Sequence, residues 1–131
     1  MRGFYAVLVV AGGLLAACGA NAGENGDAVR GAKLFRACQA CHTIDKDGGN
    51  IVGPRLYGLF GRKAGAVADY KYSDALKKSG IVWTAETVDK LFALGPAVFT
   101  PGSKMPLQAM GNAKRRADLI ASLKIATAPR D

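Results

Sequence analysis

The stretch Cys38-Gln39-Ala40-Cys41-His42 determines how the rest of the chain is interpreted. Two cysteines three positions apart, with a histidine directly after the second, form the attachment pattern of a c-type haem. The thiols form thioethers with the two vinyl groups of the porphyrin, and the adjacent histidine becomes an axial ligand of the iron. The pattern therefore predicts one haem c per chain, covalent through Cys38 and Cys41, with His42 on the iron.

Two other uses of a C-x-x-C pair fit this chain less well. A thioredoxin-like dithiol is expected inside a βαβ pattern, and no such pattern surrounds residues 38 to 41. A structural zinc site needs four ligands, commonly from two paired elements. Because the chain has a single histidine and only one further cysteine, it lacks a second pair. Haem attachment remains the favoured interpretation.

Length and charge limit the architecture and the partners. A chain of 131 residues corresponds to one domain. Lys and Arg number 18 against 10 Asp and Glu, which gives a net charge of +8. Such an excess favours an acidic protein face, nucleic acid or an anionic membrane surface as partner. Nucleic acid ranks last, because clustered basic patches with exposed aromatic residues are lacking.

Residues 1–22 are interpreted as an export signal, followed by a domain over 23–131. Arg2 provides a short positive region, and an apolar stretch from Phe4 to Ala17 follows. The sequence Ala20-Asn21-Ala22 fits the A-x-A cleavage pattern and would release a soluble protein.

A second cleavage pattern competes with the first. Residues 15–18, Leu-Ala-Ala-Cys, resemble a bacterial lipobox, in which the signal is 1–17 and Cys18 carries a lipid. This alternative also accounts for the odd cysteine, since an unpaired thiol is a liability in an oxidising compartment. Both alternatives predict a periplasmic protein, either soluble or anchored to the membrane only through a lipid on Cys18.

The patterns after residue 26 predict short helices joined by long loops. Asp27 can cap a first helix that reaches Cys38, with Val29, Ala32 and Phe35 on one side. Gly31 lies four residues before Phe35, so another helix can approach closely there.

Three more helices and a strap are expected further along the chain. Ser73 caps a helix over 74–79, and Thr84 caps the next, with Val88, Leu91, Phe92 and Leu94 on its apolar side. Prolines bracket an extended strap over 97–106. The last helix runs from near Asn112 to about Ala126, with Leu119, Ile120 and Leu123 inward and Lys114, Arg115 and Arg116 outward. No alternating strand pattern occurs, so the fold class is all-α.

A six-coordinate haem needs a second axial ligand, usually histidine or methionine. His42 is the only histidine, and Met1 leaves with the signal, so Met105 and Met110 remain. Met105 lies in the proline-bracketed strap, which can hold a side chain against a flat cofactor, whereas Met110 beside Gly111 is interpreted as packing. We therefore expect Met105 to be the second ligand.

From Gly26 to about Ala126 the chain resembles a class I cytochrome c of the mitochondrial and alphaproteobacterial soluble type. The matching stretches are GxxxF at 31–35, CQACH at 38–42, GPRLYGLFGRKAG at 53–65, YKYSDALKKSGIVW at 70–83 and PGSKMP at 101–106. The resemblance implies a small fold of short helices and long ordered loops around a covalent haem. It also implies that the first and last helices cross at Gly31 and Phe35.

The resemblance also assigns roles to individual residues. It places His42 and Met105 on opposite faces of the iron, and it implies that the Pro54 carbonyl supports His42. It further implies that Arg62, Tyr72 and Trp83 hydrogen-bond around a buried haem propionate, which needs such donors.

The chain departs from the family pattern at four places. Two residues, where the family has three, separate Phe35 from Cys38. The family commonly has a tyrosine in the middle helix that donates to the methionine sulfur, where this chain has Leu91-Phe92. Leu76 stands in place of an asparagine, and Ser103 in place of a threonine. Losing a donor to sulfur lowers the potential, whereas a drier pocket raises it.

The predicted function is one-electron transfer without catalysis, by a monomer that uses a His/Met-ligated haem c. The expected partners are acidic faces of redox complexes, namely a cytochrome bc-type complex and a terminal oxidase or similar acceptor of a respiratory chain. By analogy with the family, lysines are expected around the haem edge to steer docking; they are Lys33, Lys46, Lys63 and Lys104. The alternative is a haem peroxidase or gas-ligand sensor with a labile sixth ligand, although no distal histidine or arginine pair is visible.

Overall fold

The structure is a computed structural model that describes residues 26–107 and 109–130. The predicted export segment and Cys18 lie outside the described residues. The described elements are α1 (Ala28–Phe35), the 3-10 turn η1 (Cys38–Ala40), α2 (Asp74–Lys78), α3 (Ala85–Leu94), α4 (Pro96–Phe99) and α5 (Ala113–Ala126). Within that part of the chain there is no strand, only a single bridge between Lys63 and Val82. The predicted all-α class is confirmed.

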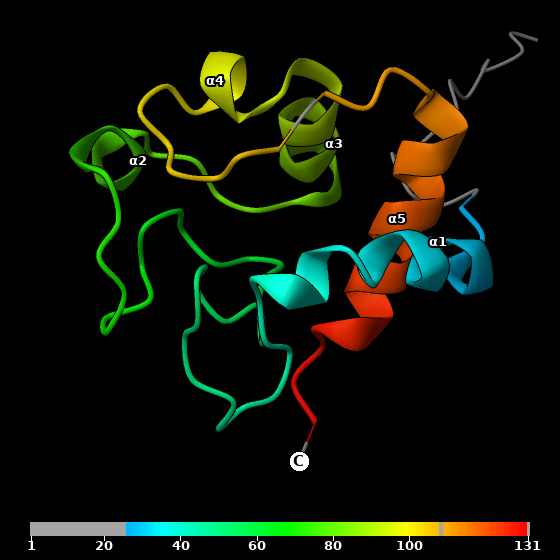
Figure 1. The fold of residues 1–131 in the computed structure, drawn as a ribbon, viewed down its shortest axis with the longest axis horizontal. Coiled ribbons are helices and arrows are strands. Elements are labelled where there is room, and N and C mark those ends of the chain that lie inside the picture. The colour runs from blue at the N-terminus through cyan, green and yellow to red at the C-terminus, as the bar shows by residue number, and fades with distance from the viewer. Residues whose placement is uncertain (1–25, 108, 131) are drawn as a thin grey trace, which may run out of the picture.

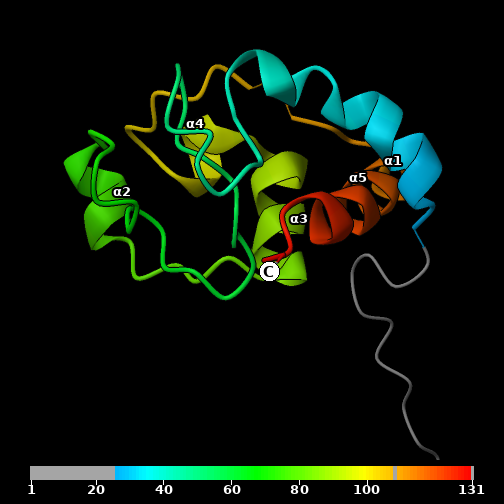
Figure 2. The same ribbon diagram turned by 90° about the horizontal axis from the view of Figure 1, so that it is seen from below.

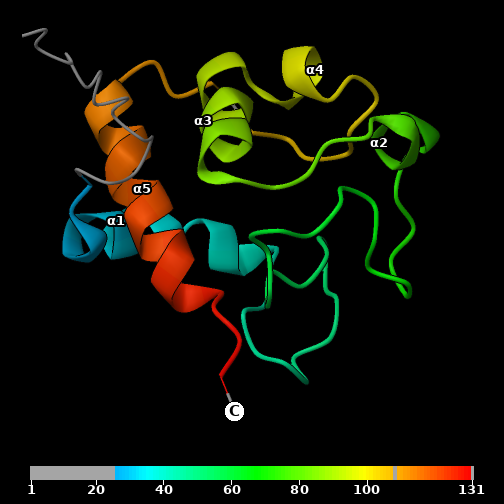
Figure 3. The same ribbon diagram turned by 180° about the vertical axis from the view of Figure 1, so that it is seen from behind.

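Helices α1 and α5 cross in direct contact (Figure 1, Figure 3). A Cβ atom on Gly31 would lie only 1.8 Å from the main-chain oxygen of Asp118, so the crossing requires glycine. Phe35, one turn later, is buried. The expected close approach at Gly31 is therefore present.

The predicted apolar side of α1 was wrong in part. Val29 is 73% exposed and Ala32 is also exposed, whereas Gly31 and Phe35 are buried. Residues four apart share a face of a helix, so the face that carries Gly31 and Phe35 turns Val29 to the opposite side. The tight crossing at Gly31 determines which face is buried.

Local capping accounts for the start of each longer helix. Asp27 accepts from the Arg30 amide at 2.9 Å, and Asn112 accepts from the Arg115 amide at 3.0 Å. Ser73 accepts from the Leu76 amide, and Thr84 forms a reciprocal capping box with Thr87. These side chains satisfy amides that lack a partner within the first helical turn.

Helix α3 buries Val88, Leu91 and Phe92 as expected, but Leu94 is 50% exposed. Leu94 is the last residue of α3, and Gly95 follows with a positive φ of 80°. The prediction that Leu94 belongs to the buried side was therefore wrong: α3 ends with this side chain outward, and the buried positions that follow are Gly95 and Pro96.

The predicted strap over 97–106 is only partly extended. Its start forms the helical turn α4, in which Pro96 occupies the first turn, where a missing N–H leaves no bond unmade. After a turn at 100–102, residues 103–107 and 109–112 form no helix, and these residues are called the strap below. Seen from below, α2 lies at the opposite end of the molecule from α1 and α5 (Figure 2).

Leu119, Ile120 and Leu123 of α5 are buried, as expected. They join Phe35, Val88 and Phe92 in the core cluster. Arg116 was wrongly expected to face solvent: its side chain is 13% exposed and pairs with Asp89 of α3. No helix among the described residues is long and apolar enough to cross a membrane.

Candidate haem-binding site

A largely apolar pocket lies between α1, the loops that follow it, α3 and the strap. It contains about 1120 Å³ of empty space, part of which is open to solvent. The pocket brings together every residue that the sequence suggested for the site: Cys38, Cys41, His42, Pro54, Arg62, Tyr72, Trp83 and Met105.

The attachment motif forms a compact turn at the pocket wall. The amides of Cys41 and His42 both donate to the Cys38 carbonyl, at 3.0 and 2.9 Å. Both thiols are free, and burial is the main cause that raises the pKa of the Cys38 thiol. A reactive redox dithiol needs a lowered thiol pKa, so the environment of Cys38 does not favour disulfide exchange.

The His42 ring is held in a defined orientation. Its Nδ1 atom lies 2.7 Å from the Pro54 carbonyl oxygen. Because a carbonyl can only accept, Nδ1 must carry the proton, and the lone pair of Nε2 is free for a metal. The Pro54 contact that the resemblance implies is thus present in the geometry.

Gly53 makes room for this ring. A Cβ atom at Gly53 would lie 2.4 Å from Cε1 of His42 and 2.9 Å from Nε2. The Gly53 amide also donates to the Cys41 carbonyl at 2.7 Å. The sequence analysis gave Pro54 a role but none to Gly53, although a Gly-Pro pair close after the histidine could have indicated this packing.

Met105 enters the pocket from the strap. Its amide donates to the Ser103 hydroxyl at 3.3 Å, and the Ser103 amide donates to the Thr100 carbonyl at 2.9 Å. Met110 does not line this pocket and packs against the core cluster instead. Of the two candidate methionines, only Met105 is placed in the pocket.

The pocket wall near the strap is apolar. Leu76 and Leu91 both line it, and Leu91 is 8% exposed. Thr100 also lines the pocket, and its hydroxyl donates to the Pro96 carbonyl at 3.1 Å. Among the described residues, no hydrogen bond reaches the Met105 sulfur.

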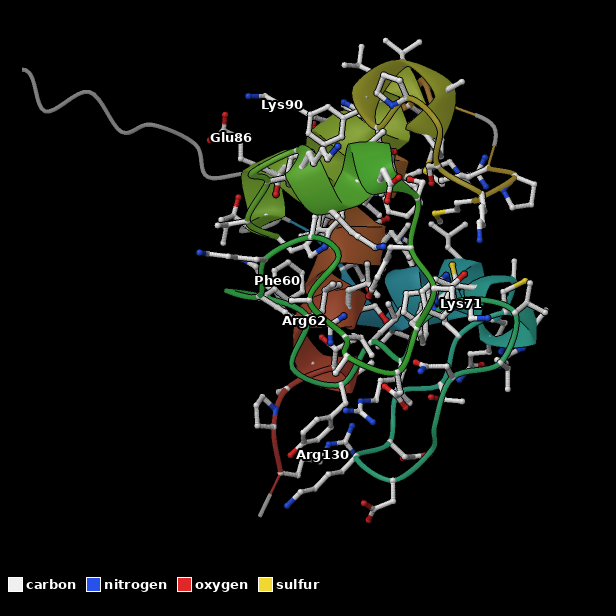
Figure 4. The ribbon with its side chains drawn as sticks, turned by 90° about the vertical axis from the view of Figure 1, so that its left-hand side faces the viewer. Phe60, Arg62, Lys71, Glu86, Lys90 and Arg130 are labelled. Atoms are coloured by element: carbon white, nitrogen blue, oxygen red, sulfur yellow. The ribbon has the colours of Figure 1, made fainter. Side chains whose placement is uncertain are left out.

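A polar group of side chains lies at another part of the wall. Arg62, among the loop segments at the centre of Figure 4, donates to the carbonyls of Arg55 and Tyr57 at 3.0 and 2.9 Å. Burial lowers the pKa of Arg62 and raises that of Tyr72. The Trp83 amide donates to the Arg62 carbonyl at 2.9 Å, so the main chains of Trp83 and Arg62 lie side by side.

Arg62 has five N–H donors, so two main-chain bonds leave donors for an anionic group. Within the described residues, neither the Tyr72 hydroxyl, which the Val67 backbone approaches, nor the Trp83 indole nitrogen donates a hydrogen bond. Three donors in a half-buried, cationic environment suit a carboxylate of a bound cofactor.

The donor set fits a covalently attached haem. Two thiols on one turn, an imidazole with a fixed Nδ1 proton, and an apolar slot with one cationic end match its vinyl groups, iron, ring and propionates. No group of three or more His, Cys, Asp or Glu side chains that could hold a metal ion by themselves occurs in the described segments. The site is that of a c-type haem protein.

The comparisons with known proteins agree with this class. The cytochrome c family model matches residues 28–121. A cytochrome c of Gibberella zeae is 48% identical over 103 residues, covering 78% of this chain and 96% of that protein. A cytochrome c of Arabidopsis thaliana is 45% identical, covering 76% and 88%.

A solved structure is similar over the same part of the chain. Cytochrome cH from Methylobacterium extorquens superposes with a TM-score of 0.69 at 44% identity, covering 76% of this chain and 99% of that chain. The chain belongs to the cytochrome c family. It carries haem c through its cysteines and is an electron-transfer protein, not an enzyme.

Proposed function

We propose that the chain carries single electrons with a haem iron held between His42 and Met105. The observation that supports this proposal is that both side chains line one pocket and come from two different segments: the attachment turn and the strap. A permanently filled sixth position distinguishes a carrier from a haem enzyme or gas sensor. The relatives from Gibberella zeae and Theileria parva are named cytochrome c and do not favour that alternative.

In this proposal the protein keeps the site rigid and dry. When bound, the haem supplies an iron that changes between ferrous and ferric states. Pro54 fixes the His42 proton, Gly53 supports the ring, and Leu76 and Leu91 exclude water beside Met105. Because little has to reorganise around the iron, electron transfer is fast.

Arg62, Tyr72 and Trp83 are proposed to hold a haem propionate. Burying that carboxylate without donors would be unfavourable, and the guanidinium offers charge-assisted hydrogen bonds. This group therefore anchors the end of the cofactor opposite its thioether edge.

The two methionines provide a matched test of the iron ligands. Met105→Ala should abolish the methionine-to-iron band at the red end of the oxidised spectrum, lower the midpoint potential and open the iron to carbon monoxide. Met110→Ala, which removes the same side chain outside the pocket, should retain the band. Loss of the band in Met110→Ala, or its retention in Met105→Ala, would refute the assignment.

We further propose that the carrier serves a respiratory chain as a monomer, between a cytochrome bc-type complex and a terminal oxidase or similar acceptor. Of the four expected lysines, Lys104 lines the pocket, whereas Lys33, Lys46 and Lys63 are exposed elsewhere. Steering by positive charge predicts that the association rate falls as salt rises. A salt-insensitive rate with Lys104→Gln equal to wild type would exclude steering by this residue.

Export to the periplasm is proposed from residues 1–22, with release as a soluble protein or retention through a lipid on Cys18. Mass spectrometry of the mature protein decides between the two. A start at Gly23 indicates the soluble form, and a lipidated Cys18 at the N-terminus indicates the anchored form. An intact Met1 in the mature protein would contradict both.

A further inference from the structure

The strap that carries Met105 has few main-chain attachments of its own. Among the described residues, no backbone-to-backbone hydrogen bond involves positions 104–107 or 109. Before this segment the Ser103 amide donates to the Thr100 carbonyl, and after it the Met110 amide donates to the Phe92 carbonyl at 2.6 Å. Beside Met105, only the Ser103 hydroxyl and a bond from Lys104 Nζ to the Lys71 carbonyl, at 3.1 Å, hold the segment. The position of Met105 therefore also depends on how firmly the two ends of the strap are held.

One side chain holds the second end. Nη1 of Arg116 donates to the carbonyl oxygens of Met110 and Gly111, at 2.9 and 3.0 Å. These bonds are charge-assisted and consequently stronger than neutral ones. Arg116 belongs to α5, so the end of the strap is tied to the helix that packs against α1.

The same guanidinium is fixed from another direction. Its Nε atom donates to Oδ1 of Asp89 at 2.8 Å, and the two side chains are 13% and 27% exposed. Asp89 is on α3, one turn from Phe92, whose carbonyl receives the Met110 amide. Arg116 thus joins α3, α5 and the strap at one point.

A role limited to pairing α3 with α5 would need only the Asp89 contact. The two carbonyl bonds go beyond that contact, and both acceptors lie where the strap meets α5. Planar guanidinium groups can serve an acid and neighbouring carbonyls at the same time, whereas an ammonium group presents a single point charge.

We propose that Arg116 is a positioning residue for Met105: it fixes the end of the strap and so keeps the sulfur at the iron. This inference rests on the proposed His42/Met105 ligation. Without Arg116, the strap should leave the pocket more often, although no ligand to the iron has been changed. The sixth position should then accept outside ligands more readily.

The test uses the full, haem-loaded protein and four variants. Arg116→Ala removes all three bonds, Arg116→Lys retains a cation for Asp89, and Asp89→Asn removes only the acid. Arg30→Ala is the matched control, because Arg30 forms a comparable ion pair with Asp118, at 2.8 Å, in the contact between α1 and α5. The measurements are the affinity of the oxidised protein for imidazole and the hydrogen exchange of the two hydrogen-bonded strap amides, those of Met105 and Met110.

Arg116→Ala should raise the apparent imidazole affinity by roughly tenfold or more, as expected for losing charge-assisted bonds to the strap. Hydrogen exchange of the strap amides in Arg116→Ala should be faster than in the wild type. Arg116→Lys should show an imidazole affinity and a strap exchange rate between those of the wild type and Arg116→Ala. Arg30→Ala should destabilise the fold without a selective change in strap exchange. Equal imidazole affinities and equal strap exchange in Arg116→Ala and Arg30→Ala would overturn the proposal.

The two proposals fail in different ways. If Met105→Ala retains the methionine band, the ligand assignment is wrong, but strap exchange in Arg116→Ala still reports whether Arg116 holds this segment. If Met105→Ala loses the band while Arg116→Ala leaves strap exchange unchanged, only the positioning role is refuted.

Discussion

The Nδ1 atom of His42 lies 2.7 Å from the carbonyl oxygen of Pro54, and the ring packs against Gly53. A carbonyl acceptor fixes the proton on Nδ1, so Nε2 is the only ring nitrogen that can bind a metal. Hydrogen bonding of the outer nitrogen also raises the basicity of the ligand. The orientation and the electron donation of the imidazole are thus set by two neighbouring main-chain positions.

Gly53→Ala should disturb this arrangement. The new Cβ would lie 2.4 Å from Cε1 of His42, so the ring must move away from Pro54. We expect a loss of about 1–3 kcal/mol in the free energy of unfolding, typical of overpacking, together with a raised midpoint potential from weaker donation. Denaturant unfolding and redox titration measure the two effects.

Gly111→Ala is the control for this change. Gly111 has no neighbour within 4 Å of an added Cβ, and its carbonyl bond to Arg116 is retained. Its stability and potential should stay close to wild type, within about 0.5 kcal/mol. If Gly53→Ala behaves like Gly111→Ala, the ring is not held as described.

Gly31→Ala tests the crossing of α1 and α5. The added Cβ would lie 1.8 Å from the Asp118 carbonyl oxygen and 2.8 Å from Cβ of Ser122. The usual helical gain of alanine over glycine, about 1 kcal/mol, should be outweighed, with a net loss of roughly 2 kcal/mol or more. Thermal unfolding of the holoprotein measures the change, and Val29→Ala, on the 73% exposed side of α1, should be nearly neutral.

Local signals predicted the haem motif and the helix starts. The order of Cys38, Cys41 and His42 is dictated by covalent chemistry within five residues, and caps such as Asp27 and Thr84 act over three. Met105 could be selected by elimination, because the chain offers few ligands. Local signals do not determine which face or segment packs against which, because tertiary contacts decide that.

Three wrong expectations illustrate this limit. Val29 was placed inward because helical spacing identifies an apolar face but not the closer approach at Gly31. Leu94 was placed inward because it follows Leu91 by three residues, but α3 ends at Leu94 and the side chain faces outward. Arg116 was placed outward because charge suggests solvent, whereas its partners lie on α3 and at the end of the strap.

Arg62→Gln should lower the midpoint potential. A half-buried positive charge at the pocket favours the ferrous state, since the ferric state adds a positive charge nearby. Removing that charge should make the free energy of reduction less favourable by roughly 1 kcal/mol. For one electron this lowers the midpoint potential by on the order of 50 mV. Redox titration measures the shift, and Arg130→Gln, at an exposed position near the end of the described chain (Figure 4), should change it little. An unchanged potential in Arg62→Gln would argue against a role near the cofactor.

Asp118 should make stability depend on pH in the acidic range. The Arg30 guanidinium and then the Asp27 amide lower the pKa of this carboxyl from 3.8 to about 2, and its side chain is 5% exposed. Because the folded-state pKa lies below the unfolded one, its contribution is complete above pH 3.8 and is lost as pH falls toward 2. The melting temperature of the wild type should therefore fall in this window by more than that of Asp118→Asn, whose side chain cannot ionise. Asp74→Asn, at a side chain that is 82% exposed, should leave the wild-type slope intact. Parallel melting curves for wild type and Asp118→Asn between pH 5 and 2 would show that the Arg30 pair does not stabilise the helix crossing.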